Sequence, residues 1–232
     1  MTNRIIIDQV SRRLRDVTKK TWQLDILLAA LNSAFQSVVN VRPDSNTVHR
    51  NMTLVEGHEQ RIDDDLYKLV HVLHNVDPAT NQPRRAITKA NMGTMDSIFP
   101  HWRQDKVRGY IEHYMLDELD DRVFYNWPPA AGPKTVIGED GEDQLVSDEL
   151  IRIVAAIVPV VTEADLDNPI PLNSTHHPAI MEWMLYYCYA VDDELTANSA
   201  RPDVHFRNFF NLMNTKIQNT LRIQQIRENV DA

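Results

Sequence analysis

WQLDILLAALNSAFQSVVNVRPDSNTVHRNMTL, residues 22–54, contains the change of periodicity that decides the fold. Its first part, Trp22 to Asn40, predicts an amphipathic helix, because apolar residues recur every three or four positions. Pro43 disfavours helical geometry at the residue before it, so the helix is expected to end there. From Asn46 onward, Val48, Met52 and Leu54 alternate with polar residues, which is the period of a strand.

Three further segments show the helical period. Asn3 to Val17 carries one apolar stripe. A third helix is predicted to start behind the pair His176-His177 and Pro178, because serine, threonine and proline suit a first turn. The third and fourth helices have these apolar stripes: Ile180, Met184, Tyr187, Cys188, Val191 and Leu195; then Phe206, Phe209, Phe210, Met213, Ile217 and Leu221.

Short strands are predicted between the two pairs of helices. Residues 48–54 and 59–62 are expected to form a hairpin around Glu56-Gly57. The strands 110–116 and 122–127 are expected to pair across the acidic turn 117–121. Leu150 to Val161 is predicted to be a buried strand, because much of it is too uniformly apolar for a surface edge.

These patterns together predict an α+β fold, a four-helix bundle with an inserted small antiparallel β unit. The bundle is expected to comprise residues 1–45 and 172–221, and the inserted β-rich unit residues 46–171. Residues 222–232 lose clear periodicity and are interpreted as a C-terminal tail that a partner orders.

Composition excludes several classes of protein. The chain has 232 residues, a formal net charge of −9 and one cysteine. An internal disulfide is therefore excluded. A DNA-coating protein would be basic, because phosphate neutralisation supplies most of its affinity. No apolar run approaches the roughly 20 residues that span a bilayer, so no membrane segment is expected.

The sequence shows no pattern of residues with catalytic spacing. His176 and His177 with nearby Glu182 are the best metal candidate, but adjacent histidines rarely bind one ion. His71 and His74 are a weaker pair. The six glycines form no phosphate-binding loop. We therefore expect no enzyme, no metal and no cofactor, with a metal-dependent hydrolase and a monomeric protein-binding module as the alternative functions.

A basic cluster occurs at the end of the first helix. It consists of Arg12, Arg13, Arg15, Lys19 and Lys20. Cations at this place suit the helix dipole, so a solvated helix end is one interpretation. Contact with DNA or with a partner protein is the other.

The order of four motifs resembles the bacteriophage head-to-tail adaptor family, similar to T7-like tail tubular adaptors. The resemblance covers nearly the whole chain. The motifs are Trp22-x-Leu24-x-x-Leu27-Leu28-x-x-Leu31-Asn32-x-Ala34 with Val41-Arg42-Pro43-Asp44; Thr53-Leu54-Val55-x-Gly57 with Gln60-x-Ile62; Phe124-Tyr125-x-Trp127-Pro128-Pro129; and Ile170-Pro171-Leu172 with His177-Pro178-Ala179-Ile180.

This resemblance implies a structural virion protein in the phage neck or tail, assembled in the host cytoplasm. It implies a ring of about twelve copies that joins the portal protein to the tail nozzle protein, with a tail fibre as a further partner. DNA would pass through the lined exit channel without specific binding. Portal contacts are expected at Ile217, Leu221, Arg222, Ile223, Ile226 and Arg227. Nozzle or fibre contacts are expected at Asp117, Glu118, Asp120, Glu139, Asp140 and Glu142.

Overall fold

The computed structural model describes residues 1–137, 143–146, 149–191 and 201–215. The chain divides into two compact units. The helical unit combines Met1–Asn46 with Val158–Ala232, and the β unit is Thr47–Ile157.

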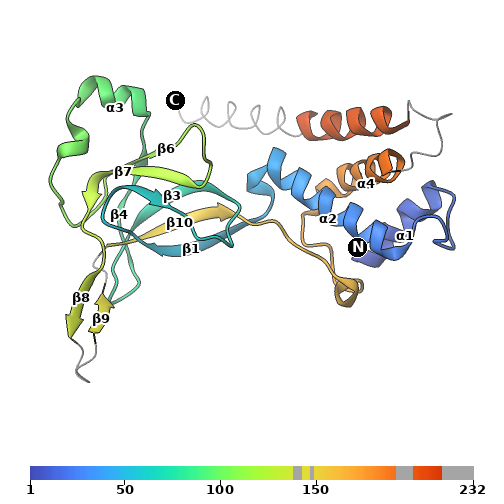
Figure 1. The fold of residues 1–232 in the computed structure, drawn as a ribbon, viewed down its shortest axis with the longest axis horizontal. Helices are drawn as coiled ribbons and strands as arrows, with labels where there is room; N and C mark the ends of the chain where they lie inside the picture. Colours follow the sequence, from blue (N-terminus) through green and yellow to red (C-terminus); the bar gives the residue numbers. More distant parts are fainter. Residues whose placement is uncertain (138–142, 147–148, 192–200, 216–232) are drawn as a thin grey trace, which may run out of the picture. The chain divides into compact units, whose positions relative to one another are not determined.

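Helices make up most of the regular structure of the first unit (Figure 1). They are α1 (Asn3–Arg13), α2 (Leu24–Val41), α4 (His177–Val191) and a helical segment at 201–215. Three short 3-10 turns also lie here: Pro43–Ser45, Glu163–Asp165 and Ser174–His176.

The pairing of α2 with α4 forms the centre of the helical unit. The apolar stripe expected for α2 is buried, including Leu27, Leu31 and Phe35. The indole nitrogen of Trp183 on α4 donates a hydrogen bond to the Ser33 hydroxyl on α2 at 3.0 Å. By length and composition alone α2 could cross a membrane, but its apolar face is covered by protein, as in a core helix.

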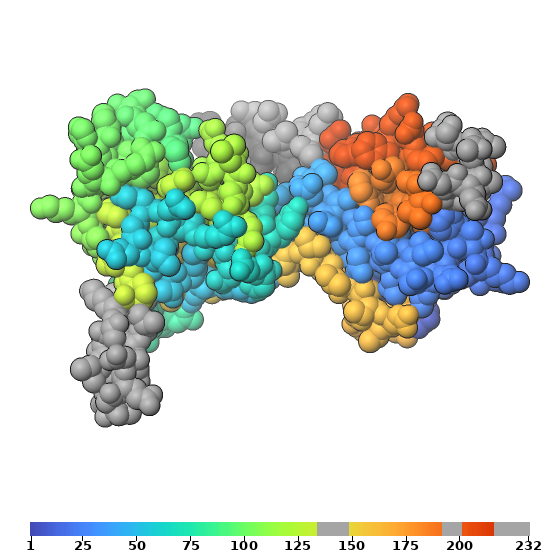
Figure 2. All heavy atoms as spheres, in the orientation of Figure 1, coloured from blue at the N-terminus to red at the C-terminus, as the bar shows by residue number. Residues whose placement is uncertain are grey.

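The 201–215 helix packs on α4 through aromatic rings. Trp183 meets Phe209 edge to face with ring centroids 4.8 Å apart, and Phe209 is fully buried. Such ring pairs stabilise the fold by about 0.5–1.5 kcal/mol beyond the contribution from burial of their apolar surface. Figure 2 shows this helix in red lying against α4 in orange, with α1 and α2 in blue.

The first helix packs on α4 and α2, and its start is also hydrogen-bonded to the loop at 166–170. Thr2 pairs with Pro169, and the Arg4 amide donates to the Leu166 carbonyl at 2.8 Å. The helix ends at Arg13, because Arg15 adopts a left-handed conformation with φ +61°. The prediction of a helix to Val17 was therefore four residues too long.

Two four-stranded sheets form the second unit, in the orders β1-β10-β3-β4 and β2-β7-β6-β5. A separate two-stranded ribbon, β8-β9, comes between β7 and β10 in the sequence. The strands are β1 (Thr47–Thr53), β2 (Gly57–Arg61), β3 (Lys68–Val76), β4 (Pro83–Ala86), β5 (Thr88–Lys89), β6 (His113–Leu116), β7 (Val123–Ala130), β8 (Lys134–Ile137), β9 (Asp143–Val146) and β10 (Leu150–Ala156). The short helix α3 (Met92–Ile98) connects β5 to β6.

The two four-stranded sheets share one apolar cluster. Ile151 and Ile153 of the first sheet and Phe124 of the second are fully or almost fully buried in it. The prediction of a buried strand is confirmed for Leu150–Ala156, since β10 lies between β1 and β3, but its predicted end at Val161 was five residues too far. The predicted pairing across the acidic turn is also confirmed, since β6 pairs with β7.

The predicted hairpin of residues 48–54 with 59–62 is wrong. β1 pairs with β10, whereas β2 pairs with β7 in the other sheet. The buried side chain of Gln60 explains how the chain can pass from one sheet to the other between β1 and β2. Its amide accepts from the Val55 N–H and donates to the Val55 carbonyl, both at 2.8 Å. A side chain thus satisfies the backbone groups that a hairpin partner would have bound.

The predicted four-helix bundle with a small β insert is also wrong. The fold is a sheet-rich α+β structure with two four-stranded sheets among the described residues. The β region has a buried cluster of its own, so it is not a small appendage. The helical period showed that each helix has an apolar face, but not that Asn3 and Arg4 at the start of α1 would hydrogen-bond to the loop at 166–168.

Candidate functional site

An exposed turn between β6 and β7 contains three of the residues expected to bind a partner. The Asp117 carboxylate accepts hydrogen bonds from the backbone N–H groups of Leu119 at 2.7 Å and Asp120 at 2.8 Å. These bonds hold the pKa of Asp117 below its usual value. The turn is therefore fixed by its own side chain, in an Asx-type arrangement.

The other two residues of this set differ in their surroundings. Asp120 accepts from the Arg122 backbone N–H at 2.9 Å and from the Arg61 guanidinium at 2.9 Å. The first of these contacts is the main cause of its lowered pKa. Glu118 is exposed. Asp120 thus supports the turn, whereas Glu118 lies at its surface.

Leu119 at the tip of the turn was not predicted as a contact residue. Its side chain is 99% exposed. An isolated exposed leucine is common, but this one lies in a turn whose backbone is fixed by Asp117. A sequence signal was present, because a single apolar residue interrupts the acidic run 117–121.

The remaining predicted contact residues lie outside the described part of the chain. Ile217, Leu221, Arg222, Ile223, Ile226 and Arg227 follow the described 201–215 helix. Glu139, Asp140 and Glu142 lie between β8 and β9. The expectation for these nine residues stays a prediction.

The histidines considered as metal ligands are placed in different settings. His176 is buried at the end of a 3-10 turn, and His177 begins α4. His71 Nδ1 lies 2.5 Å from the Tyr114 hydroxyl. Glu182 Oε2 lies 2.8 Å from His205 Nδ1 and its Oε1 accepts from Arg13. Within the described residues, no three His, Cys, Asp or Glu side chains converge as metal ligands.

The basic cluster at the end of α1 borders a concave pocket of about 420 Å³. Its described lining combines arginines with apolar rings and comprises Arg13, Leu14, Arg15, Asp16, Thr21, Trp22, Tyr189 and Arg201. The loop after α1 is folded around Asp16, whose carboxylate accepts from the N–H groups of Lys20, Thr21 and Trp22 at 2.8–3.0 Å. These bonds, led by that from Trp22, lower the Asp16 pKa.

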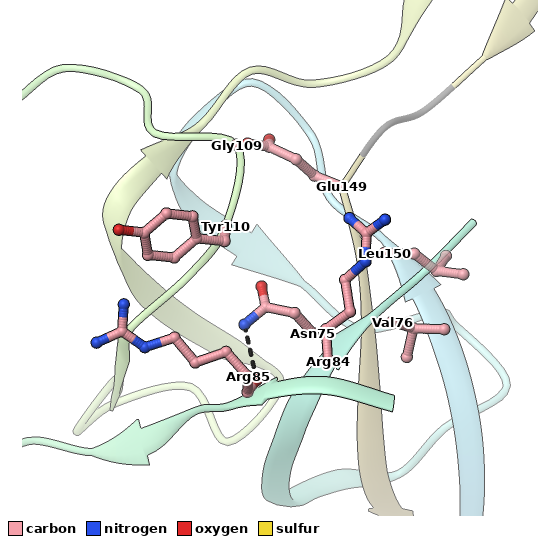
Figure 3. A pocket seen from close by; sticks show the side chains of 8 residues that line it. All are labelled: Asn75, Val76, Arg84, Arg85, Gly109, Tyr110, Glu149 and Leu150. Atoms are coloured by element: carbon pink, nitrogen blue, oxygen red, sulfur yellow. Dashed lines mark hydrogen bonds between the residues drawn. The ribbon is translucent and has the colours of Figure 1, made fainter. Parts of the chain in front are cut away.

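A second pocket, of about 390 Å³, lies in the β unit near the end of β3 (Figure 3). Arg84 and Arg85 border it, but their side chains diverge in Figure 3. Arg84 pairs with Asp77 at 2.5 Å, and Arg85 pairs with Glu112 at 3.4 Å and lies over the Tyr110 ring. Arg84 is thus paired with Asp77, and Arg85 shares Glu112 with Arg108. The two arginines diverge and do not form a shared anion site.

Comparison with known proteins identifies the kind of molecule to which these surfaces belong. The family model described as SU10 adaptor protein matches residues 1–229. The chain belongs to the SU10 adaptor protein family. No curated protein matches it significantly.

Family membership confirms the resemblance seen in the sequence. The adaptor is a structural protein of a bacteriophage, placed in the virion neck or tail. Its family implies interaction with portal and tail components. An adaptor functions through surfaces that contact its partners, and the 117–121 turn and the arginine-bordered pocket are two candidates.

Proposed function

We propose that the adaptor forms a ring of about twelve identical copies that joins the portal to the tail nozzle and lines the DNA exit channel. The match to an adaptor family across residues 1–229 carries this proposal. The ring assembles in the host cytoplasm. DNA passes through it without specific binding, in keeping with the formal net charge of −9.

The physical character of the two units supports a load-transmitting role. Each unit has closely packed apolar residues, and packed interiors transmit strain with little compression. The β unit enters and leaves the helical sequence through β1 and β10, which pair along seven rungs from Thr47↔Ala156 to Thr53↔Leu150. Both ends of the insertion are thus tied to each other by a ladder of hydrogen bonds.

Two sets of residues provide the proposed contacts. Ile217, Leu221, Arg222, Ile223, Ile226 and Arg227 bind the portal, because apolar and arginine side chains are enriched where protein partners meet. Glu139, Asp140 and Glu142 contact the nozzle or fibre. Asp117, Glu118 and Asp120 lie apart from these sets, in the 117–121 turn of the β unit.

Reconstitution with the portal tests this function. Purified adaptor is mixed with portal rings, separated by sedimentation and imaged by cryo-electron microscopy. We expect a closed ring of adaptor stacked on the portal, with the copy number of the portal. An adaptor that stays in the soluble fraction and leaves portal images unchanged would refute the proposal.

A matched pair of variants tests the portal contacts separately. Replacing Ile217, Ile223 and Ile226 together by serine removes three apolar anchors, and we expect co-sedimentation to fall at least about tenfold. Replacing Gln218, Gln224 and Gln225 by serine changes the same number of residues in the same segment. Equal loss in both variants would show that the apolar side chains are not the anchors.

A further inference from the structure

The 117–121 turn presents an apolar side chain between carboxylates. Leu119 is 99% exposed, and Glu118 beside it is exposed as well. The Asp117 side chain fixes the backbone on both sides of the tip through bonds to the Leu119 and Asp120 N–H groups. Little conformational entropy would be lost on docking, because the turn is already held in one shape.

The pocket at the end of α1 offers the opposite chemistry. Leu14 and Tyr189 contribute partly exposed apolar surface to a lining that is mostly polar, whereas Trp22 is only 6% exposed. The guanidinium groups of Arg13, Arg15 and Arg201 border it, and the Arg201 group lies 5.7 Å from the Tyr189 ring centroid. The pocket volume of about 420 Å³ is within the range that binds small groups.

Two carboxylates belong to the surroundings of this pocket. Asp16 lines it, but its oxygens accept three backbone N–H groups. Glu182 pairs with Arg13 at 3.2 Å and with His205 at 2.8 Å. Among the described residues, no carboxylate pairs with Arg15 or Arg201, whereas Arg13 is paired with Glu182.

We infer that the Leu119 turn of one adaptor docks into the arginine-bordered pocket of a neighbouring adaptor. Leu119 packs on Leu14 and Tyr189. Glu118 meets Arg15, because Arg201 already lies over the Tyr189 ring. Charge complementarity between the acidic turn and the arginines supports this occupant. Leu119 also gives the turn an apolar group that can use the exposed surface of Leu14 and Tyr189, which a nucleic-acid phosphate cannot. A concave pocket also suits a protruding turn better than the convex surface of a duplex.

The symmetry of such a contact agrees with ring formation. The turn belongs to the β unit and the pocket to the helical unit, so the two contacting patches differ. A heterologous contact repeated about an axis closes a ring. The inference rests on the proposed function, and its test is designed so that the two can fail separately.

Disulfide cross-linking between copies tests the inference directly. The variant Leu119→Cys/Thr21→Cys places one thiol at the turn and one at the exposed rim of the pocket. The native Cys188 is buried and will not interfere. Under mild oxidation of portal-bound rings, we expect a ladder of cross-linked multimers on a non-reducing gel. Leu119→Cys/Glu163→Cys, with an exposed site away from the pocket lining, should give at least about tenfold less product.

Mixing the single variants identifies which copies are joined. Leu119→Cys adaptor mixed with Thr21→Cys adaptor should give cross-linked dimers and nothing larger. Rings that form on the portal without any cross-link, a cross-link within one chain, or a cross-link from Leu119→Cys to the nozzle would each overturn the inference and leave the proposed function intact. Absence of portal-bound adaptor in the unmodified protein would instead refute the proposed function.

Charge exchange gives a second readout that does not depend on thiols. Arg15→Glu and Glu118→Arg should each weaken ring assembly roughly tenfold, because each places like charges face to face. The combination of both substitutions should restore assembly. Single variants that assemble normally, or a double variant no better than either single one, would contradict the docking.

Discussion

The side chain of Asn75 is hydrogen-bonded to the backbone of Ile111 in both directions. Its Nδ2 donates to the Ile111 carbonyl at 2.8 Å, and its Oδ1 accepts from the Ile111 N–H at 2.8 Å. Asn75 lies on β3 in the first sheet, and Ile111 precedes β6 in the second. A single buried amide thus connects the two sheets where no strand ladder does.

Removal of this amide should destabilise the β unit. In Asn75→Ala the buried N–H and carbonyl of Ile111 lose their partners, and unsatisfied buried groups cost about 1–3 kcal/mol each. We expect the free energy of unfolding to fall by about 2–6 kcal/mol, measured by urea denaturation. Gln82→Ala, an exposed amide in the connection before β4, should change it by less than about 0.5 kcal/mol. Equal effects would mean that the Asn75 bonds contribute little.

Gly132 is expected to tolerate no larger residue. Its φ is +72°, and a Cβ there would lie 2.7 Å from the Glu56 backbone nitrogen. Gly132→Ala therefore adds a backbone clash to the cost of a left-handed conformation, for a total loss of about 2–5 kcal/mol. Gly109→Ala is the matched control, because its φ is +73° with no atom within 4 Å of the new Cβ.

The difference in stability between these two glycine variants isolates the loss that is caused by the steric clash with Glu56. Gly109→Ala should cost about 1–2 kcal/mol, the price of the left-handed conformation alone. Thermal unfolding of both proteins measures the difference. Similar values for both would indicate that the chain near Glu56 moves aside easily.

The loop after α1 should open at low pH. The pKa of Asp16 is lowered by hydrogen bonds from backbone N–H groups, first from Trp22. Because the folded pKa lies below the unfolded one, the stabilisation is present above the ordinary aspartate pKa and is lost as pH falls through the folded value. Protection of the Thr21 and Trp22 amides from hydrogen exchange, corrected for intrinsic rates, should therefore decline below about pH 4.

The Asp16→Ala variant should lose that protection already at neutral pH. Glu118→Ala, which removes an exposed carboxylate in the other unit, should leave it unchanged. Protection in Asp16→Ala that matches the unmodified protein would show that the loop is held by other contacts.

The Cys188 thiol should be inert in the folded protein. Burial raises its pKa to about 12, because the thiolate would lose its hydration. Alkylation by iodoacetamide at pH 8 should be at least about 100-fold slower than in 6 M guanidinium. Rapid alkylation of the native protein would mean that α4 opens readily.

The β unit should fold when produced alone as residues 47–157. Its ends lie on the paired strands β1 and β10, with Thr47 opposite Ala156, and it has its own buried apolar cluster. We expect a cooperative unfolding transition and dispersed amide resonances. Residues 57–157, which lack β1 and expose the edge of β10 but keep β2, should not give either. An unfolded 47–157 fragment would show that the unit depends on the helices.

Part of the fold was predictable because it depends on local periodicity. The apolar stripe of α2, the pairing of β6 with β7 across an acidic turn, and the burial of β10 follow from side-chain spacing. The pairing of β1 with β10 and of β2 with β7, in place of a β1–β2 hairpin, was not predictable in this way. It depends on the Gln60 amide reaching the Val55 backbone, a contact that no alternation of apolar and polar residues signals.

The candidate contact surfaces were likewise predictable only in part. The order of its motifs was sufficient to assign the chain to a phage adaptor family, and its acidic turn and basic cluster were visible as charges. Only the tertiary structure placed Trp22, Tyr189 and Arg201 around one pocket and left Leu119 exposed at a fixed tip. Sequence determines which elements form, because they arise from neighbours a few residues apart. The pocket joins residues nearly 180 positions apart, and only packing of the whole chain brings such residues together.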